Sequence, residues 1–256
     1  MHHHITITTD AGRESVYVSA FKGILYRAFS EVVITEINTN IASRNIQQAA
    51  FSLQHSFTYF PAETLHIIDV DSSFVLYKRL LYTKHENQHF IALDNGVLSL
   101  VLPDVQTQVF EVVTSSIENQ SRYEKFAFAA KHILNGTKTI EMFKPIANVV
   151  TFKHQLPGII GNRITAQIIA IDNYGNCITN LHFDELNRHL RGRKVVIRLP
   201  MDIVFKGVMN SYYDVEDGEC VCIKNNMGLL EIAIHNANAS QLLGLHEKSS
   251  IIFEME

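Results

Sequence analysis

Acidic and amide side chains follow three short strand-like runs in the first half of the sequence. Asp10 follows the run 5–9, Asp69 and Asp71 close the run that begins at Leu65, and Asn95 follows a third run. A carboxylate only accepts hydrogen bonds, so one aspartate can accept from both hydroxyls of a vicinal diol. Each residue alone could be a cap or turn residue. Together they predict a pocket that binds hydroxyl groups or a cation.

The second half contains one short stretch that is unusually rich in polar side chains. It lies between two apolar runs, and a two-residue Asn-Gly turn would be enough to connect them as a hairpin. The stretch instead carries five polar side chains, namely Asp172, Asn173, Asn176, Thr179 and Asn180. This excess favours a binding role for the turn.

Common catalytic and metal-binding signatures are absent from the sequence. It has no phosphate-binding loop, no G-x-G-x-x-G, no H-E-x-x-H and no G-x-S-x-G. The opening "MHHH" fits a tag remnant, a native strand start or a metal site, and His85 and His89 are interpreted as loop residues. No acidic or sulfur ligand accompanies the histidine run, so no metal site is predicted.

Composition narrows the class of partner and compartment. The net charge of −4 gives no general attraction to nucleic acid or to acidic lipid. Three cysteines cannot form a full disulfide framework, which fits a reducing compartment. No apolar run reaches the roughly 20 residues that span a bilayer, and no signal-peptide pattern opens the chain. We therefore expect a cytoplasmic protein with neither a nucleic-acid nor a membrane partner.

The elements that must position the first group of residues alternate between strand and helix. Strands are predicted over 5–9, 32–37, 65–70, 89–94 and 109–114, and helices over 14–29, 44–57 and 123–136. Strands separated by helices imply a largely parallel sheet covered on both faces. The carboxyl ends of parallel strands are where ligands bind in such sheets.

The pattern changes to short strands in the second half. Six strand-like runs between Ile164 and Met255 contain only two helix-like stretches, 183–190 and 238–245. We therefore predict an α/β N-terminal domain over 1–145, a linker over 146–160 and a mostly antiparallel β domain over 161–256. The β domain is expected to be a small barrel or sandwich.

Taken in order, these stretches resemble the S-adenosylmethionine (SAM) hydroxide adenosyltransferase family, relatives of fluorinase and chlorinase. The matching segments run from residue 5 to about 245 and include "ITITTDAG", "FPAETLHIIDVD", "FIALDNGVLS", "IDNYGNCITN" and "MGLLEIAIHNANASQLLGL". The resemblance implies two domains and a homotrimer, with each active site between neighbouring subunits. It also implies attack at C5′ of SAM by water, hydroxide or halide, with release of methionine and with no cofactor besides the substrate.

The resemblance assigns roles to individual residues. It implies that Asp10 holds the ribose diol, Asp172 the methionine amino group and Asn176 the adenine. Asn226 falls where the family has a serine at the methionine end. Asn95, in "DNG", is counted with these substrate-binding residues.

The sequence also departs from the hydrolytic members of the family. Their strand-end aspartate matches Asp71, but their arginine falls at Lys78, with Arg79 next to it, and their histidine falls near Ser121. We expect Asp71, Lys78 and Arg79 to form the catalytic group. Loss of a general base typically reduces a rate by roughly 100- to 10,000-fold, so binding is better supported than fast turnover.

The leading interpretation is a SAM hydrolase that forms adenosine and methionine, with turnover that these departures slow. One alternative is a catalytically weakened protein that binds SAM or adenosine, and another is a trimer with no small-molecule role. Halogenation is not expected, because Phe74 would crowd the loop that forms the halide pocket.

Overall fold

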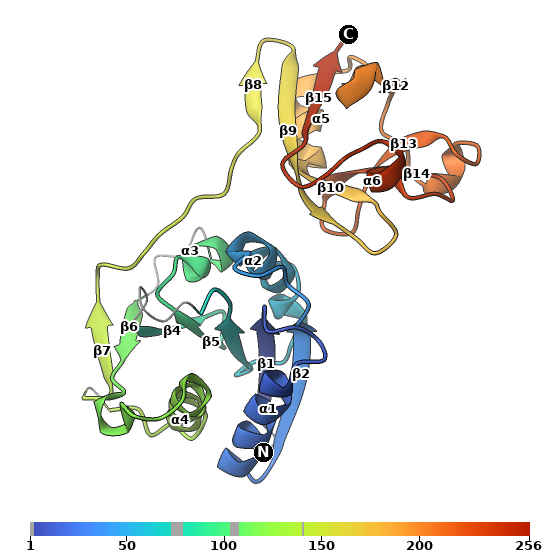
Figure 1. Cartoon of the computed structure of the whole chain (residues 1–256). Helices are drawn as coiled ribbons and strands as arrows, with labels where there is room; N and C mark the ends of the chain where they lie inside the picture. Colours follow the sequence, from blue (N-terminus) through green and yellow to red (C-terminus); the bar gives the residue numbers. More distant parts are fainter. Residues whose placement is uncertain (1–2, 73–78, 103–107, 140) are drawn as a thin grey trace. The chain divides into compact units, whose positions relative to one another are not determined.

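The computed structural model describes residues 3–72, 79–102, 108–139 and 141–256. The chain forms two compact units, Met1–His154 and Gln155–Glu256. Figure 1 shows a helix-covered sheet in the first unit and a strongly curled sheet in the second. Each unit has a hydrophobic core of its own.

In the described part of the first unit, seven strands form one sheet in the order β2-β1-β3-β5-β4-β6-β7. Strands β2, β1, β3 and β5 run parallel, and β4, β6 and β7 extend the sheet with antiparallel pairing. The strands are β1 (His3–Thr9), β2 (Val32–Asn38), β3 (Leu65–Asp69), β4 (Leu80–His85), β5 (Gln88–Leu93), β6 (Val109–Val112) and β7 (Phe143–Ile146). His3 and His4 of the opening histidine run thus begin β1.

Helices cover both faces of this sheet. The core on one face joins β1 and β3 to α1 (Val16–Ala28) and α4 (Arg122–Leu134), and the core on the other face involves α2 (Ile46–Gln54) and α3 (Val97–Val101). Successive strand residues point to opposite faces, so Leu65 and Ile67 pack in the first core and Ile68 in the second. These layers confirm the predicted α/β N-terminal domain.

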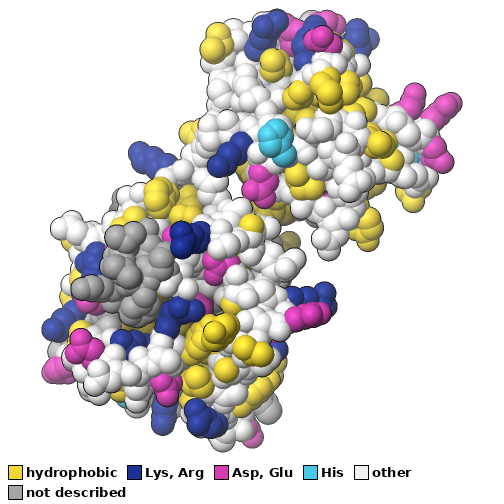
Figure 2. Space-filling model, viewed as in Figure 1, with side chains coloured by type: hydrophobic (Ala, Val, Ile, Leu, Met, Phe, Trp, Pro, Cys, Tyr) yellow, Lys and Arg dark blue, Asp and Glu magenta, His cyan; other side chains and the backbone are white. Residues whose placement is uncertain are grey.

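Hydrophobic side chains remain exposed on α1, where Val16, Tyr17 and Tyr26 all face solvent. Figure 2 shows hydrophobic side chains gathered on this side of the first unit, around α1. Among the described residues, no helix has both the length and the apolar character required to cross a membrane.

The prediction that His85 and His89 are loop residues is wrong. His85 ends β4, and His89 is a buried residue of β5. The two strands form a hairpin whose turn residues, Glu86 and Asn87, have φ of 46° and 60°. A polar stretch therefore makes a tight turn of the left-handed type that asparagine tolerates.

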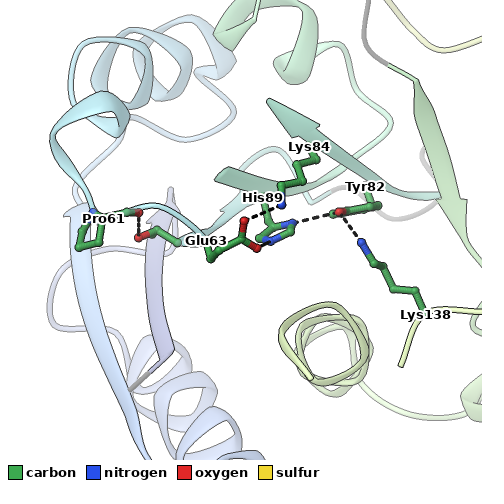
Figure 3. A network of polar contacts seen from close by, with 7 residues as sticks. Pro61, Glu63, Tyr82, Lys84, His89 and Lys138 are labelled. Atoms are coloured by element: carbon green, nitrogen blue, oxygen red, sulfur yellow. Dashed lines mark hydrogen bonds and ion pairs between the residues drawn. The ribbon is translucent and has the colours of Figure 1, made fainter. Parts of the chain in front are cut away.

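A polar network surrounds His89 at the end of the sheet opposite the predicted ligand site (Figure 3). Its Nε2 atom lies 2.8 Å from Oε2 of Glu63, and its Nδ1 atom lies 3.0 Å from the hydroxyl of Tyr82. Lys138 Nζ donates to that hydroxyl at 2.9 Å. Burial raises the pKa of Tyr82 to about 12, so the phenol stays protonated and the network is structural.

The second unit, all of which is described, contains one antiparallel sheet of eight strands. The order is β12-β11-β15-β9-β10-β14-β13, with β8 (Gly158–Ile160) paired to β9. The other strands are β9 (Arg163–Ile171), β10 (Cys177–His182), β11 (Val195–Arg198), β12 (Val204–Lys206), β13 (Cys220–Lys224), β14 (Leu229–Ile234) and β15 (Ser250–Met255).

This sheet curls into a nearly closed barrel, which confirms the predicted β domain. Beyond β12 the chain reaches the opposite edge strand, where Met209 N donates to the carbonyl oxygen of Cys222 at 2.8 Å. Two short helices accompany the sheet, α5 (Phe183–Leu190) and α6 (Ala239–Leu242).

Candidate functional site

The carboxyl ends of β1 and β3 bring three aspartates to one edge of the first sheet. The two strands are parallel neighbours, with Thr9 opposite Asp69. Strand β1 lies between β2 and β3, so the chain moves from β1 to β2 on one side and then crosses to β3 on the other side. Ligands bind at such switch points of α/β sheets. Asp10 and Asp71, which follow these strands, lie at that point.

Asp10 connects two of the loops at this edge. Its Oδ2 atom accepts from the backbone N–H of Arg44 at 2.7 Å and from that of Asp71 at 3.2 Å. The structure describes no protein hydrogen bond to its Oδ1 atom. One carboxylate oxygen therefore fixes the loops after β2 and β3, and the other oxygen can accept from a ligand hydroxyl.

Asp71 lies beside a cation that the sequence analysis did not single out. Arg44 Nε is 3.8 Å from Asp71 Oδ1, and the Arg44 side chain is 73% exposed. Both residues have positive φ, 63° for Arg44 and 49° for Asp71, and such strained backbone is concentrated at functional sites. The position of Arg44, between β2 and α2 at the same edge of the sheet, is the signal that could have found it.

The other predicted catalytic residues are placed differently. Lys78 lies outside the described residues. Arg79 is directed at neighbouring protein groups, because its Nη2 donates to Oδ2 of Asp94 and, at 2.9 Å, to the carbonyl oxygen of Asn148. Asp94 also accepts from Val150 N at 2.8 Å. Arg79 and Asp94 thus hold the chain segment that follows β7.

Asn95 is buried, and its amide is occupied by the protein. Its Nδ2 donates to the carbonyl oxygen of Val70 at 2.8 Å, and its Oδ1 accepts from Val97 N at 3.2 Å. The side chain therefore joins the end of β3 to α3. Through Val70 it supports the loop that carries Asp71.

A buried ion pair lies behind the strand ends. Asp69 is only 1% exposed, and its two oxygens lie 2.8 and 3.1 Å from Nε and Nη2 of Arg122. Burial raises the pKa of Asp69 to about 6, although Arg122 acts in the opposite direction. Sequence reasoning missed Arg122. Its neighbour Ser121, the position expected for the family histidine, is the N-cap of α4 and forms a capping box with Glu124.

The second unit contains a pocket of about 600 Å³ built around the polar turn. This volume is within the range of small-molecule sites. The pocket is lined by Asp172, Tyr174, Asn176, Tyr212, Tyr213, Ile234, His235, Asn236 and Ala237. A separate pocket of about 370 Å³, between β12 and β13, contains none of the predicted site residues.

Asp172 and Asn176 hold the turn and also face this pocket. Asp172 Oδ1 accepts from the backbone N–H groups of Tyr174 and Asn176, each at 2.9 Å, and its Oδ2 accepts from Asn176 Nδ2 at 3.0 Å. The Asn176 side-chain oxygen is not used in these bonds. The turn is therefore held in place by hydrogen bonds within the protein.

Two other polar residues of the stretch have structural partners. Thr179 Oγ1 donates to the carbonyl oxygen of Leu230 at 2.8 Å, and Asn180 Oδ1 accepts from Gln167 N at 2.8 Å. These bonds join β10 to β14 and β9. The polar excess thus serves two purposes, pocket formation at Asp172 and Asn176 and strand pairing further along.

Asn226 lies apart from Asp172 and Asn176 within the second unit. It is an exposed residue of the turn that precedes β14, whereas Asn176 lies near the other end of that strand. The register pairs Cys177 with Ile232 and His182 with Leu229. The structure therefore does not bring Asn226 to the pocket of its own unit.

Acidic groups at a sheet switch point, joined to a β domain with a polar, aromatic pocket, are typical of proteins that recognise small polar molecules. Models of two domains match most of the chain: the SAM hydroxide adenosyltransferase N-terminal domain over residues 5–144 and its C-terminal domain over 166–252. The chain belongs to the SAM hydroxide adenosyltransferase family, as its sequence motifs predicted.

Relatives match along nearly the whole length of the chain. A protein of Methanocaldococcus jannaschii named (R)-S-adenosyl-L-methionine hydrolase is 25% identical over 263 residues, which cover 94% of this chain and 92% of the relative. A Thermus thermophilus protein of the same name is 22% identical, with 93% and 94% covered.

Solved structures show the same fold. An uncharacterized conserved protein from Thermotoga maritima superposes with a TM-score of 0.85 at 25% identity, covering 97% of this chain and 99% of that one. A conserved hypothetical protein from Thermus thermophilus gives 0.75 at 20% identity over the full length of both chains, and this likeness concerns the fold alone.

Proposed function

We propose that this protein hydrolyses SAM to adenosine and methionine. The observation that carries the proposal is the arrangement of Asp10 and Asp71 at the ends of β1 and β3, with Arg44 Nε 3.8 Å from Asp71. One carboxylate is suited to hold the ribose diol and the other to orient water. The names of the two hydrolase relatives support this choice of substrate.

The proposed reaction is a direct displacement at C5′. The oxygen of water forms a bond to C5′, the C5′–S bond breaks, and its electron pair passes to the sulfur, which leaves as the neutral thioether of methionine. The attacking water passes one proton to solvent, so the products are adenosine, methionine and that proton. The neutral thioether leaves without protonation, so the protein must mainly hold water in line with the C5′–S bond. Arg44 places a positively charged group 3.8 Å from the carboxylate that is proposed to orient this water.

Residues of the second unit are assigned to the two ends of the substrate. Asp172 accepts from the methionine amino group, and Asn176 contacts adenine, as the family resemblance implies. The pocket of about 600 Å³ that both residues line supports these roles. Asn226 is assigned to the methionine end by the family resemblance alone, since it does not line the pocket that Asp172 and Asn176 share.

The position of Ser121 favours one alternative function. Ser121 caps α4 and supplies no base, and Arg79 is directed at Asp94 and Asn148. A protein that binds SAM or adenosine without turnover would have the same binding residues. Catalysis alone separates the two proposals.

The deciding experiment incubates purified protein with SAM and follows adenosine and methionine by chromatography. The biological sulfonium epimer and its R form should be tested separately, because both hydrolase relatives are named for the R form. Formation of both products in equal amounts, above the rate in buffer, supports the hydrolase. Tight binding with no product above that rate would support the binding protein instead.

We also propose a homotrimer whose sites are shared between the N-terminal domain of one subunit and the C-terminal domain of the next. The exposed apolar side chains of α1 support association, since large exposed apolar groups often mark interaction surfaces. Light scattering measures the mass of the assembly directly. A stable monomer that binds SAM with full affinity would contradict the shared site.

A cytoplasmic location is proposed from the state of the cysteines. Cys177, Cys220 and Cys222 are all free, and free thiols persist in reducing compartments. Cell fractionation with detection of the protein tests this location.

A further inference from the structure

A buried carboxylate lies behind the wall of the C-terminal pocket. Glu231, on β14, is only 4% exposed. The hydroxyl of Tyr212, which lines the pocket, donates to Glu231 Oε1 at 2.5 Å. Asn225 Nδ2 donates to Glu231 Oε2 at 3.3 Å. Both oxygens of the buried carboxylate are therefore hydrogen-bonded, and one of them fixes the phenol of Tyr212.

This contact determines whether the Tyr212 hydroxyl donates or accepts a hydrogen bond in the pocket. A phenol has one proton to donate and an oxygen that can also accept. Burial and the hydrogen bond to Glu231 raise the pKa of Tyr212, so the proton stays on the phenol and is directed at Glu231. The Tyr212 oxygen can then contact a ligand only as an acceptor.

Asp172, which also lines the pocket, likewise offers a ligand only hydrogen-bond acceptors. Its carboxylate accepts from the turn through both oxygens and has no proton to offer a ligand. Within the described part of the chain, neither Asp172 nor Glu231 has an ion-pair partner. The pocket wall thus carries acceptors and uncompensated negative charge.

The exposed aromatic rings complete this environment. Tyr174 and Tyr213, which also line the pocket, are 80% and 81% exposed. The faces of tyrosine rings attract cations. A ligand that brings N–H donors and a positive charge matches every one of these groups.

The geometry points to Tyr212 as a residue that selects the ligand by its ammonium group, with Glu231 as the positioning residue that keeps the Tyr212 oxygen an acceptor. The inference rests on the proposed function, because the ammonium group is then the amino group of the methionine arm. The Tyr212 oxygen is thus a second acceptor beside Asp172, and the buried Glu231 keeps it an acceptor.

The test compares two ligands that differ only in the amino group. S-adenosylhomocysteine has the amino-acid arm and a neutral sulfur, and its deamino analogue has hydrogen in place of the amine. Calorimetry gives Kd for both. The wild-type protein should bind the amine about tenfold or more tightly, as expected for hydrogen bonds to a charged group.

Two variants examine the mechanism. In Glu231→Gln the side-chain amide can donate to the Tyr212 oxygen and turn the phenol proton toward the pocket, and Tyr212→Phe removes the oxygen. Each should lower the preference for the amine about fivefold to tenfold and leave Kd for the deamino analogue unchanged. Matched controls are Glu185→Gln on α5 and Tyr59→Phe, which is exposed in the first unit.

The outcomes are distinct. An unchanged preference in both variants, or an equal loss of both ligands, overturns the role of Tyr212 and Glu231 and leaves the proposed function standing. Wild-type protein that binds neither ligand overturns both. If Glu231→Gln does not fold, as thermal unfolding would reveal, Tyr212→Phe decides the question, since Tyr212 is half-buried and its ring is retained.

Discussion

The Nε atom of Arg122 lies 2.8 Å from the Oδ1 atom of Asp69, so the first residue of α4 neutralises a buried carboxylate at the end of β3. The hydrogen bond of the pair runs from Nη2 to Oδ2 at 3.1 Å, whereas Nε and Oδ1 are close but lack hydrogen-bond geometry. Arg122 also lies over the ring of Tyr123, 4.9 Å from its centroid. The pair joins α4 to the strand that leads to Asp71.

Arg122→Ala should destabilise the protein strongly. It leaves Asp69 buried without its partner, which typically lowers the free energy of unfolding by about 3–5 kcal/mol. The pKa of Asp69, already about 6, should rise further without the cation, so the carboxyl is neutral in the folded variant at pH 5. The loss should therefore be larger at pH 8 than at pH 5 in urea denaturation. Arg27→Ala, at an exposed position on α1, is the control. If Arg122→Ala lost equal stability at pH 5 and pH 8, the explanation would be contradicted.

Asp71→Asn should separate turnover from binding. Asparagine keeps the shape of the side chain but loses the charge that orients water, so adenosine affinity should be nearly unchanged. Turnover should fall about 100-fold or more. Asp184→Asn, at an exposed position on α5, is the matched control. If the variant were less stable but its turnover per folded molecule were unchanged, Asp71 would be a structural loop residue.

Asp10→Ala should weaken the binding of adenosine by about 1.5–3 kcal/mol, the typical effect of a hydrogen bond to a charged group. Calorimetry at matched folded fraction measures it. The variant also removes the acceptor for Arg44 N and Asp71 N, so thermal unfolding must be recorded in parallel. An unaltered Kd would show that Asp10 only fixes these loops.

Gly175→Ala should disturb the C-terminal pocket more than an ordinary glycine substitution. Gly175 has φ of +88°, and a Cβ atom there would lie 2.2 Å from side-chain atoms of Asn238. Gly218→Ala is a matched control, with φ of +83° and no neighbouring atom within 4 Å. Both variants bear the roughly 1–2 kcal/mol of left-handed backbone strain, so the additional loss at Gly175 reports the clash. Equal denaturation midpoints would show that Asn238 moves away at no cost.

His66 should make the protein sensitive to acid. The ring is fully buried between Thr6 and Gln88, and burial lowers its pKa to about 4. The unfolded chain therefore binds the proton first. The buried neutral His66 ring contributes its full share to the free energy of unfolding above pH 6.5. This contribution, about 3 kcal/mol in total, is lost as the pH falls toward 4. The free energy of unfolding of His66→Gln should lack this part of the pH dependence, and identical slopes would refute the assignment.

The apolar runs were sufficient to predict most of the architecture. Runs such as Leu65–Asp69 and Leu229–Ile234 became buried strands, because short apolar runs that contain isoleucine fit a buried position in a sheet. Strand β4 was missed because its apolar part is short and continues into a polar hairpin turn at Glu86 and Asn87. Local pattern alone does not distinguish such a turn from a loop.

The polar partners were harder to predict than the polar residues themselves. Asp10, Asp71 and Asp172 stand out in the sequence because each follows an apolar run. Arg44 and Arg122 do not, because each acquires its partner only when strands 27 to 53 residues away come beside it. Their roles depend on tertiary geometry, which sequence spacing does not encode.

The double hydrogen bond at Asp10 has a consequence for the rate at which a ligand is captured. A single carboxylate oxygen holds the amides of Arg44 and Asp71, so the protein itself fixes the backbone at these two residues. Ordering such loops during binding would otherwise reduce affinity, because each immobilised residue loses conformational entropy. A nucleoside that reaches this edge of the sheet therefore need not order the backbone at Arg44 and Asp71, which favours fast capture.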